Sequence, residues 1–185
     1  AKRQVRAQNL VLAVSHLRES LRSSGPFYES LKALKVLGGE DPDIQNGLEA
    51  LAPFAKTGIK TVEVLRREFD TVAENIRLLT PKDTSEQNPK NPLSEVFKQV
   101  TSLVKVRKTG NNNSEVSETN PVVTARIQLD KGDLEGAIAT LSDFYGPEAA
   151  VIAGWLEDAR GRLIAETALS RLHVFVVSIL ATSIR

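Results

Sequence analysis

The chain has 185 residues and carries 24 Lys and Arg side chains against 23 Asp and Glu, so its formal net charge is +1. A general nucleic-acid-binding protein is usually more basic, and this balance argues against that class. The absence of cysteine excludes disulfides, thiolate metal sites and cysteine nucleophiles together.

The composition indicates an all-α fold. Aromatic residues make up only 5% of the chain, while Leu, Val, Ala and charged helix formers are plentiful. The chain begins with Ala1 and contains no Met, so we expect it to be part of a longer protein. No signal peptide is visible, and the most apolar run, residues 174–184, is too short and too interrupted by Ser and Thr to span a bilayer. We therefore expect any membrane anchor to lie upstream.

Residues 3–23 form the first predicted helix. Leu10, Val14, Leu17 and Leu21 step by four, three and four, which is the seam of a heptad pattern. This helix is either the end of a longer coiled coil or an ordinary amphipathic helix, and two heptads alone favour the second reading.

Short helices with tight turns follow. Gly25-Pro26 breaks the chain, a second helical stripe begins at Phe27, and Gly38-Gly39 ends it. Asp41-Pro42 is a cap followed by a first-turn proline, and it starts a third helix that ends before Pro53. This pattern predicts a compact stack of helices.

The clearest predicted helix covers residues 61–79, with apolar side chains stepping by three and four. Its other face is charged. Glu63 with Arg67, and Arg66 with Asp70, are spaced for i,i+4 ion pairs. We interpret this charged face as solvated.

Residues 81–92 are rich in Pro, Asn, Lys and Ser and are typical of a linker. Residues 93–108 are predicted to form an amphipathic basic helix, whose cations could contact an anionic membrane. These candidate membrane-binding residues are Lys98, Lys105, Arg107 and Lys108. The alternative is a core helix with basic residues at its C-terminal end, where they suit the helix dipole.

The C-terminal part predicts a helical hairpin and one long helix. Gly132 suits the left-handed end of one helix, and Asp133 can cap the next, in which Leu134 starts the apolar pattern. Pro147 suits the first turn of the long helix. The run around Phe175 and Val176 is apolar on more than one face, so the N-terminal helix or a second copy must cover it.

The sequence gives no support for an enzyme. His16 and His173 lie far apart without a third ligand at a useful spacing, so we expect no metal site. Phosphate-binding glycine loops and nucleophile elbows are absent as motifs. We expect no catalytic residue, no cofactor, no small-molecule substrate and no nucleic-acid partner.

The sequence resembles a known family. Gly132-Asp133-Leu134, followed after one helix by Trp155-Leu156-x-x-Ala159-Arg160, looks like the C-terminal signature of mitofilin. The upstream motifs look like its alphaproteobacterial, periplasmic relatives: Gly25-Pro26-Phe27, Leu51-Ala52-Pro53-Phe54-Ala55, Gly58, and Leu103-Val104-Lys105-Val106-Arg107.

The sequence pattern divides the chain into three predicted regions: an N-terminal helical region with a coiled-coil end over 1–80, a linker with the basic helix over 81–121, and a mitofilin-like C-terminal unit over 122–185. The resemblance implies a non-enzymatic scaffold that organises the inner membrane from its periplasmic side, shapes it, and tethers it to outer-membrane β-barrel assembly machinery.

Homo-oligomers are expected as well. Trp155, Phe175 and Val176 are candidate assembly residues, and a buried core position is the alternative for Trp155. Gly132, Asp133, Leu134 and Arg160 are the structural motif. Two other readings stay open: a HemX-like periplasmic helical protein with a similar Leu-Val-x-Val-Arg stretch, and a plain helical-repeat adaptor without a membrane role.

Overall fold

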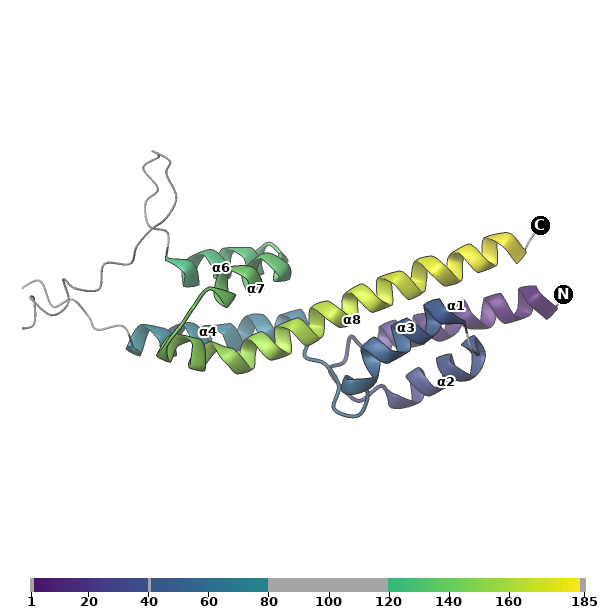
Figure 1. The fold of residues 1–185 in the computed structure, drawn as a ribbon, viewed down its shortest axis with the longest axis horizontal. Coiled ribbons are helices and arrows are strands. Elements are labelled where there is room, and N and C mark those ends of the chain that lie inside the picture. The colour runs from purple at the N-terminus through teal and green to yellow at the C-terminus, as the bar shows by residue number, and fades with distance from the viewer. Residues whose placement is uncertain (1, 40, 80–119, 184–185) are drawn as a thin grey trace, which may run out of the picture. The chain divides into compact units, whose positions relative to one another are not determined.

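The computed structural model describes residues 2–39, 41–79 and 120–183, and every regular element in these ranges is a helix (Figure 1). The all-α prediction is therefore confirmed. The described residues belong to one compact unit. The elements are α1 Lys2–Ser20, α2 Tyr28–Gly38, α3 Pro42–Leu51, the 3₁₀ turn η1 Ala52–Phe54, α4 Val62–Leu79, α6 Pro121–Asp130, α7 Leu134–Ser142 and α8 Pro147–Ser183.

The 37-residue helix α8 is shared by two hydrophobic cores (Figure 1). Its C-terminal part packs with α1, α2 and α3, and we call this group of buried residues the first core. Its N-terminal part packs with α4, α6 and α7 to form the second core. At a rise of about 1.5 Å per residue, α8 is about 55 Å long.

The first core uses the heptad-like seam of α1. Leu10, Val14 and Leu17 are all 2% exposed or less, and they pack inside this chain against the other helices of the first core. The seam therefore finds its partners within one chain, and the coiled-coil reading of it is not confirmed. The α1 helix also ends at Ser20, earlier than predicted, because a turn follows in which Ser24 has a positive φ of 56°.

A glycine lets α3 approach α8 closely. A Cβ atom added at Gly47 would lie only 2.6–2.8 Å from three carbon atoms of Leu172. Leu172 is 1% exposed, and burying a leucine side chain contributes about 1.5–3 kcal/mol to stability. The lack of a side chain at Gly47 therefore allows α3 and α8 to pack closely in the first core.

The caps follow the sequence prediction. The Asp41 carboxylate accepts from the backbone N–H of Asp43 at 3.1 Å, and Pro42 occupies the first turn of α3. Gly39 ends α2 with a φ of 64°. These local contacts require only neighbouring residues, which is why the sequence predicts them.

The charged face of α4 differs in part from the prediction. Arg66 pairs with Glu63 and lies near Asp130, whereas Asp70 pairs with Arg126. The expected pair of Arg66 with Asp70 is therefore wrong, because α6 brings its own charges to this face. Most of the face is solvated as expected, but the Arg66 side chain is only 28% exposed.

The N-terminal helices cover one face of the apolar run in α8. Val176 is 0% exposed inside the first core, whereas Val174 and Val177 are 66% and 44% exposed. The sequence predicts that either the N-terminal helix or a second copy packs on this run, and in the structure the N-terminal helix does so.

Among the described residues, α8 is the one helix long and apolar enough to cross a membrane, judged by length and composition alone. Only 22% of its most apolar stretch is buried. The sequence prediction considered residues 174–184 alone, and the complete helix is longer than that run. Core helices pass the same test, and α8 supplies Leu169, Leu172 and Val176 to the first core.

Candidate functional site at the hairpin and the junction of the two cores

The α6–α7 hairpin is closed by the two residues that the sequence singled out. Gly132 has a φ of 80°, and its N–H donates to the carbonyl of Leu129 at 3.0 Å. Asp133 then caps α7, its Oδ1 accepting from the N–H of Gly136 at 2.8 Å. Leu134 follows at once and is 4% exposed in the second core. This turn therefore aims the apolar face of the hairpin at α8.

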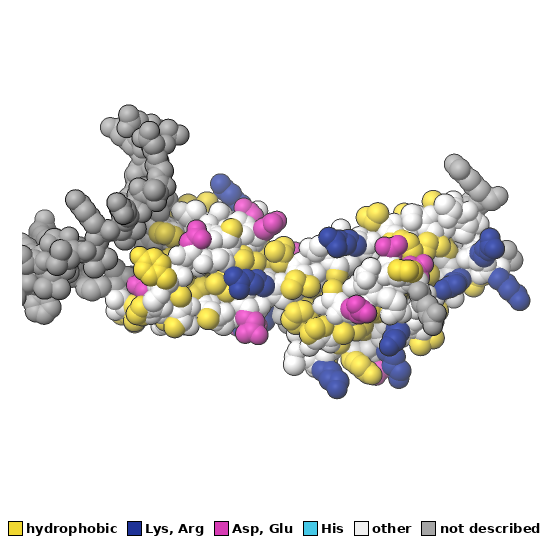
Figure 2. Space-filling model, viewed as in Figure 1, with side chains coloured by type: hydrophobic (Ala, Val, Ile, Leu, Met, Phe, Trp, Pro, Cys, Tyr) yellow, Lys and Arg dark blue, Asp and Glu magenta, His cyan; other side chains and the backbone are white. Residues whose placement is uncertain are grey.

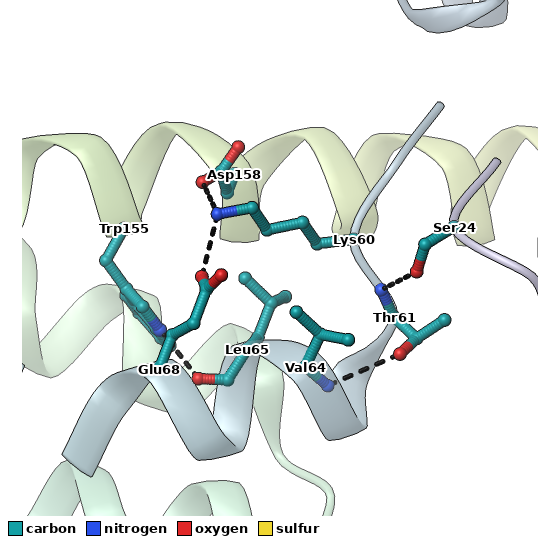
Figure 3. A network of polar contacts seen from close by, with 8 residues as sticks. All are labelled: Ser24, Lys60, Thr61, Val64, Leu65, Glu68, Trp155 and Asp158. Atoms are coloured by element: carbon teal, nitrogen blue, oxygen red, sulfur yellow. Dashed lines mark hydrogen bonds and ion pairs between the residues drawn. The ribbon is translucent and has the colours of Figure 1, made fainter. Parts of the chain in front are cut away.

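Trp155 joins α8 to α4. Its side chain is 4% exposed, and its indole Nε1 donates to the backbone carbonyl of Leu65 at 2.9 Å (Figure 3). Its ring also packs on Phe69, with ring centroids 5.2 Å apart and an interplanar angle of 56°. A buried indole N–H needs such an acceptor, so the tryptophan fixes how α4 lies on α8.

Arg160 lies on the opposite side of the same stretch of α8. It is exposed, and its Nη2 donates to Ser142 Oγ at 3.0 Å, at the end of α7. The signature residues thus have different roles. Trp155, Leu156 and Ala159 are buried in the second core, while Arg160 ties α8 to the hairpin from outside.

Arg66 makes a second tie between α4 and the hairpin. Its Nη2 donates to the carbonyl of Leu129 at 2.7 Å, near the C-terminal end of α6, where a cation is favoured by the helix dipole. Its Nε lies 3.7 Å from Asp130 Oδ1, which is an ion pair beyond hydrogen-bond distance.

Three charged side chains, those of Lys60, Glu68 and Asp158, lie where the two cores meet. We call them the charge triad. The Lys60 Nζ is 2.8 Å from Glu68 Oε2 and 2.9 Å from Asp158 Oδ2, so it bridges α4 and α8 (Figure 3). Hydrogen bonds to Glu68 and then to Asp158 raise the pKa of Lys60 above its ordinary value. Lys60 is therefore a cation at neutral pH.

Two further hydrogen bonds cross the same junction. The N–H of Thr61 donates to Ser24 Oγ at 3.1 Å, and Arg162 of α8 donates through Nη1 to the carbonyl of Leu21 at 2.9 Å. A surface groove of about 610 Å³ lies beside them, lined in part by Phe54, Lys60 and Asp158. The junction therefore holds both cores to α8 through polar contacts.

The chemistry of this junction is structural. A protonated amine with a raised pKa is a poor nucleophile, so Lys60 does not suit covalent catalysis. In the described ranges, no group of three or more His, Cys, Asp or Glu residues could hold a metal ion. The contacts at this junction hold the helices together.

The predicted site residues fall into two groups. The candidate membrane-binding residues Lys98, Lys105, Arg107 and Lys108 lie outside the described residues. Of the candidate assembly residues, Trp155 and Val176 are buried within their own chain, and Phe175 is half-buried at the edge of the first core. The assembly role of these three stays a prediction.

Sequence reasoning missed the charge triad and Arg162. Lys60 and Asp158 are 98 positions apart in the sequence, and no local pattern links them. The available signal was weak: Lys60 lies just before a helix, and Glu68 lies on its first turns. Only the packing of α4 on α8 reveals the bridge.

Comparisons with known proteins agree with the signature. The model of the mitofilin family, described as a mitochondrial inner membrane protein, matches residues 1–174. The probable magnetosome protein Mms36 of Magnetospirillum gryphiswaldense is 31% identical over 179 residues, which cover 97% of this chain and 49% of that protein. No solved structure matches the chain.

Fungal relatives are similar over most of the chain. The MICOS complex subunit mic60 of Emericella nidulans is 28% identical over 171 residues, which cover 89% of this chain and 26% of that protein. The MICOS complex subunit MIC60 of Sordaria macrospora is 29% identical over 173 residues, which cover 89% of this chain and 24% of that protein. The chain thus spans from about a quarter to about half the length of these relatives. The resemblance seen in the hairpin and around Trp155 is confirmed, and the chain belongs to the mitofilin family.

Proposed function

We propose that this chain is part of a non-enzymatic scaffold that organises the inner membrane. The observation that carries this proposal is the match to the mitofilin family over residues 1–174. The relatives named as MICOS complex subunits support it, since their name places them in a multi-subunit complex. The chain spans only part of each relative, so the role of the whole protein is inferred.

The proposed location is the periplasmic side of a bacterial inner membrane. The bacterial relative of Magnetospirillum supports a bacterial setting. In this setting the scaffold self-associates and tethers outer-membrane β-barrel assembly machinery. The helical hairpin and the junction at Lys60 give it a rigid frame, and no reaction is required of it.

Membrane contact is assigned to the basic segment 93–108, within a linker region 81–121 that lies between an N-terminal region 1–80 and a C-terminal region 122–185. The support is the sequence pattern: an apolar face with Lys98, Lys105, Arg107 and Lys108 beside it. Each cation near an anionic surface contributes about 1 kcal/mol to binding.

Flotation with anionic vesicles tests this function. The wild-type chain should float with phosphatidylserine-containing vesicles at low salt and lose binding as salt rises, because screening acts over about 10 Å at 0.1 M salt. The variant Lys105→Glu/Arg107→Glu/Lys108→Glu should lose most of this binding at unchanged helicity, measured by circular dichroism.

A matched control reverses three exposed cations elsewhere, with the variant Lys56→Glu/Arg67→Glu/Lys131→Glu. It carries the same change in net charge, so it should keep at least half of the wild-type binding if the contact is local. Equal loss in both triple variants would point to a diffuse charge effect, and a wild-type chain that never floats would refute membrane contact by this segment.

A further inference from the structure

Charge is divided unevenly between the two cores. The described residues around the first core, 2–61 without 40 and 161–183, carry eleven Lys and Arg side chains against six Asp and Glu, a net charge of +5. The residues around the second core, 62–79 and 120–160, carry six against eleven, a net charge of −5. The near-neutral total of the chain therefore hides a basic half and an acidic half. Figure 2 shows Lys and Arg gathered over α1–α3.

Part of each excess charge lies at an end of α8. Arg3 and Arg6 line a groove with Thr182 and Ser183, at the C-terminal end of that helix. Asp143 and Glu148 lie at its N-terminal end, where they line a pocket of about 310 Å³ with Phe144 and Tyr145. The helix between them is about 55 Å long, so the two charged ends cannot neutralise each other within one chain.

Several of these charges have no partner among the described residues. In the basic half, Arg3, Lys32 and Lys35 are exposed and make no ion pair there. In the acidic half, Glu135, Asp143 and Glu148 likewise make no ion pair with another described residue. Glu135 and Asp143 are exposed, and Glu148 is half-buried. Acidic groups in the first turns of α7 and α8 also suit the helix dipoles, but Asp143 follows the end of a helix and gains nothing from that effect.

We propose that copies of this chain associate head to tail, with the acidic half of one copy against the basic half of the next. A second copy is the partner because it supplies a surface of equal and opposite charge. The pocket at Tyr145 adds a specific contact: this side chain is 75% exposed beside two carboxylates, which suits a Lys or Arg side chain through cation–π and charged hydrogen bonds.

Such a contact joins two different surfaces, so it leaves one acidic and one basic half free at the ends. Repeating it gives an open chain of copies, whereas a two-fold contact closes at two. The inference rests on the proposed self-association and adds its geometry. It does not depend on the vesicle binding of segment 93–108.

Two charge-reversed variants test the contact. The first is Arg3→Glu/Lys32→Glu/Lys35→Glu, which changes the basic half from +5 to −1, and the second is Glu135→Lys/Asp143→Lys/Glu148→Lys, which changes the acidic half from −5 to +1. Light scattering should give the wild type a mass that rises with concentration at 50 mM salt and falls toward the single-chain 20.2 kDa at 500 mM salt. Each variant alone should keep the single-chain mass at both salt concentrations, with wild-type helicity by circular dichroism.

The mixture tests whether the contact pairs opposite charges. The first variant keeps an intact acidic half and the second an intact basic half, so an equimolar mixture should form a complex of two chains that stops at that size. A two-fold pairing of the same halves would complement in this mixture as well, so the wild type separates the two geometries. Its mass should rise with concentration beyond that of two chains, whereas a two-fold contact would stop at two.

Three results would overturn the proposal. The mixture could remain at the single-chain mass while both variants are folded. The wild type could associate to the same extent at both salt concentrations, which would leave self-association standing but by another surface. The wild type could also stay at the single-chain mass throughout, with vesicle binding that Arg3→Glu/Lys32→Glu/Lys35→Glu loses and Lys105→Glu/Arg107→Glu/Lys108→Glu keeps, which would assign the basic half to a membrane and not to a second copy.

Discussion

Trp155 shows what a single residue contributes and how far the sequence predicts it. Its place at helical spacing among apolar residues favours a core position, and it is indeed buried. Its acceptor, the carbonyl of Leu65, lies 90 positions away, and a backbone carbonyl carries no sequence signal. The sequence therefore offers burial as one of two readings of this side chain and does not indicate which helix it contacts.

The variant Trp155→Phe removes the indole donor and part of the packing on Phe69. We expect the free energy of unfolding to fall by roughly 1–3 kcal/mol, measured by urea unfolding with circular dichroism, because a buried hydrogen bond and some apolar contact are lost. The control Tyr145→Phe, at a 75% exposed position, should change it by less than about 0.5 kcal/mol. Equal stability of Trp155→Phe and wild type would show that this hydrogen bond is dispensable.

Lys60 predicts a pH dependence at high pH. Its pKa in the folded chain is raised above the ordinary value of 10.5 by Glu68 and Asp158, so its contribution is complete below pH 10.5 and is lost as the pH rises through the folded pKa. The side chains are about two-fifths exposed, so the contribution is on the order of 0.5–1 kcal/mol.

The stability difference between wild type and Lys60→Met should therefore be constant from pH 7 to about 10 and shrink above 10.5. Urea unfolding of both proteins across this range measures it, and the titration of other lysines cancels in the difference. A difference that grows with pH would contradict the assignment of the charge triad.

At the scale of elements, the sequence predicts local geometry well. The break at Gly132, the cap at Asp133 and the start of α8 at Pro147 all occur as expected, because each depends on residues within one turn. The sequence predicts the ion pairs of α4 less well, since α6 carries Arg126 and Asp130 to the same face. Local rules describe a helix end, while the choice of partner across helices depends on packing.

Two glycines give a matched test of the hairpin turn. An added Cβ would meet nothing within 4 Å at Gly132 or at Gly154, so space is equal at the two sites. Gly132 has a φ of 80°, whereas Gly154 lies inside α8. Gly132→Ala should lower the free energy of unfolding by about 1 kcal/mol through backbone strain.

Gly154→Ala should raise it by up to about 1 kcal/mol, because alanine is the better helix former. Thermal unfolding of both variants gives the two signs directly. If Gly132→Ala were as stable as Gly154→Ala, the left-handed turn would not be what closes the hairpin.

At the scale of the whole described unit, the decisive feature is that one helix serves two cores. The sequence leaves open whether the N-terminal helix or a second copy packs on the apolar part of α8, because an apolar face does not specify its packing partner. The structure places α1 and α3 there, and polar contacts from Lys60, Thr61 and Arg162 cross the junction. We therefore expect the two cores to unfold together.

Val176→Asp tests this coupling. Val176 is 0% exposed in the first core, so an unpaired carboxylate there should cost several kcal/mol, whereas Val174→Asp, at 66% exposure, should cost less than about 0.5 kcal/mol. The single tryptophan lies in the second core, so its fluorescence reports on that core alone while circular dichroism reports on all helices. If the helix α8 couples the cores, Val176→Asp should shift the fluorescence and dichroism transitions to the same lower temperature. A fluorescence transition that stays at the wild-type temperature while the dichroism transition splits would show that each core folds on its own segment of α8.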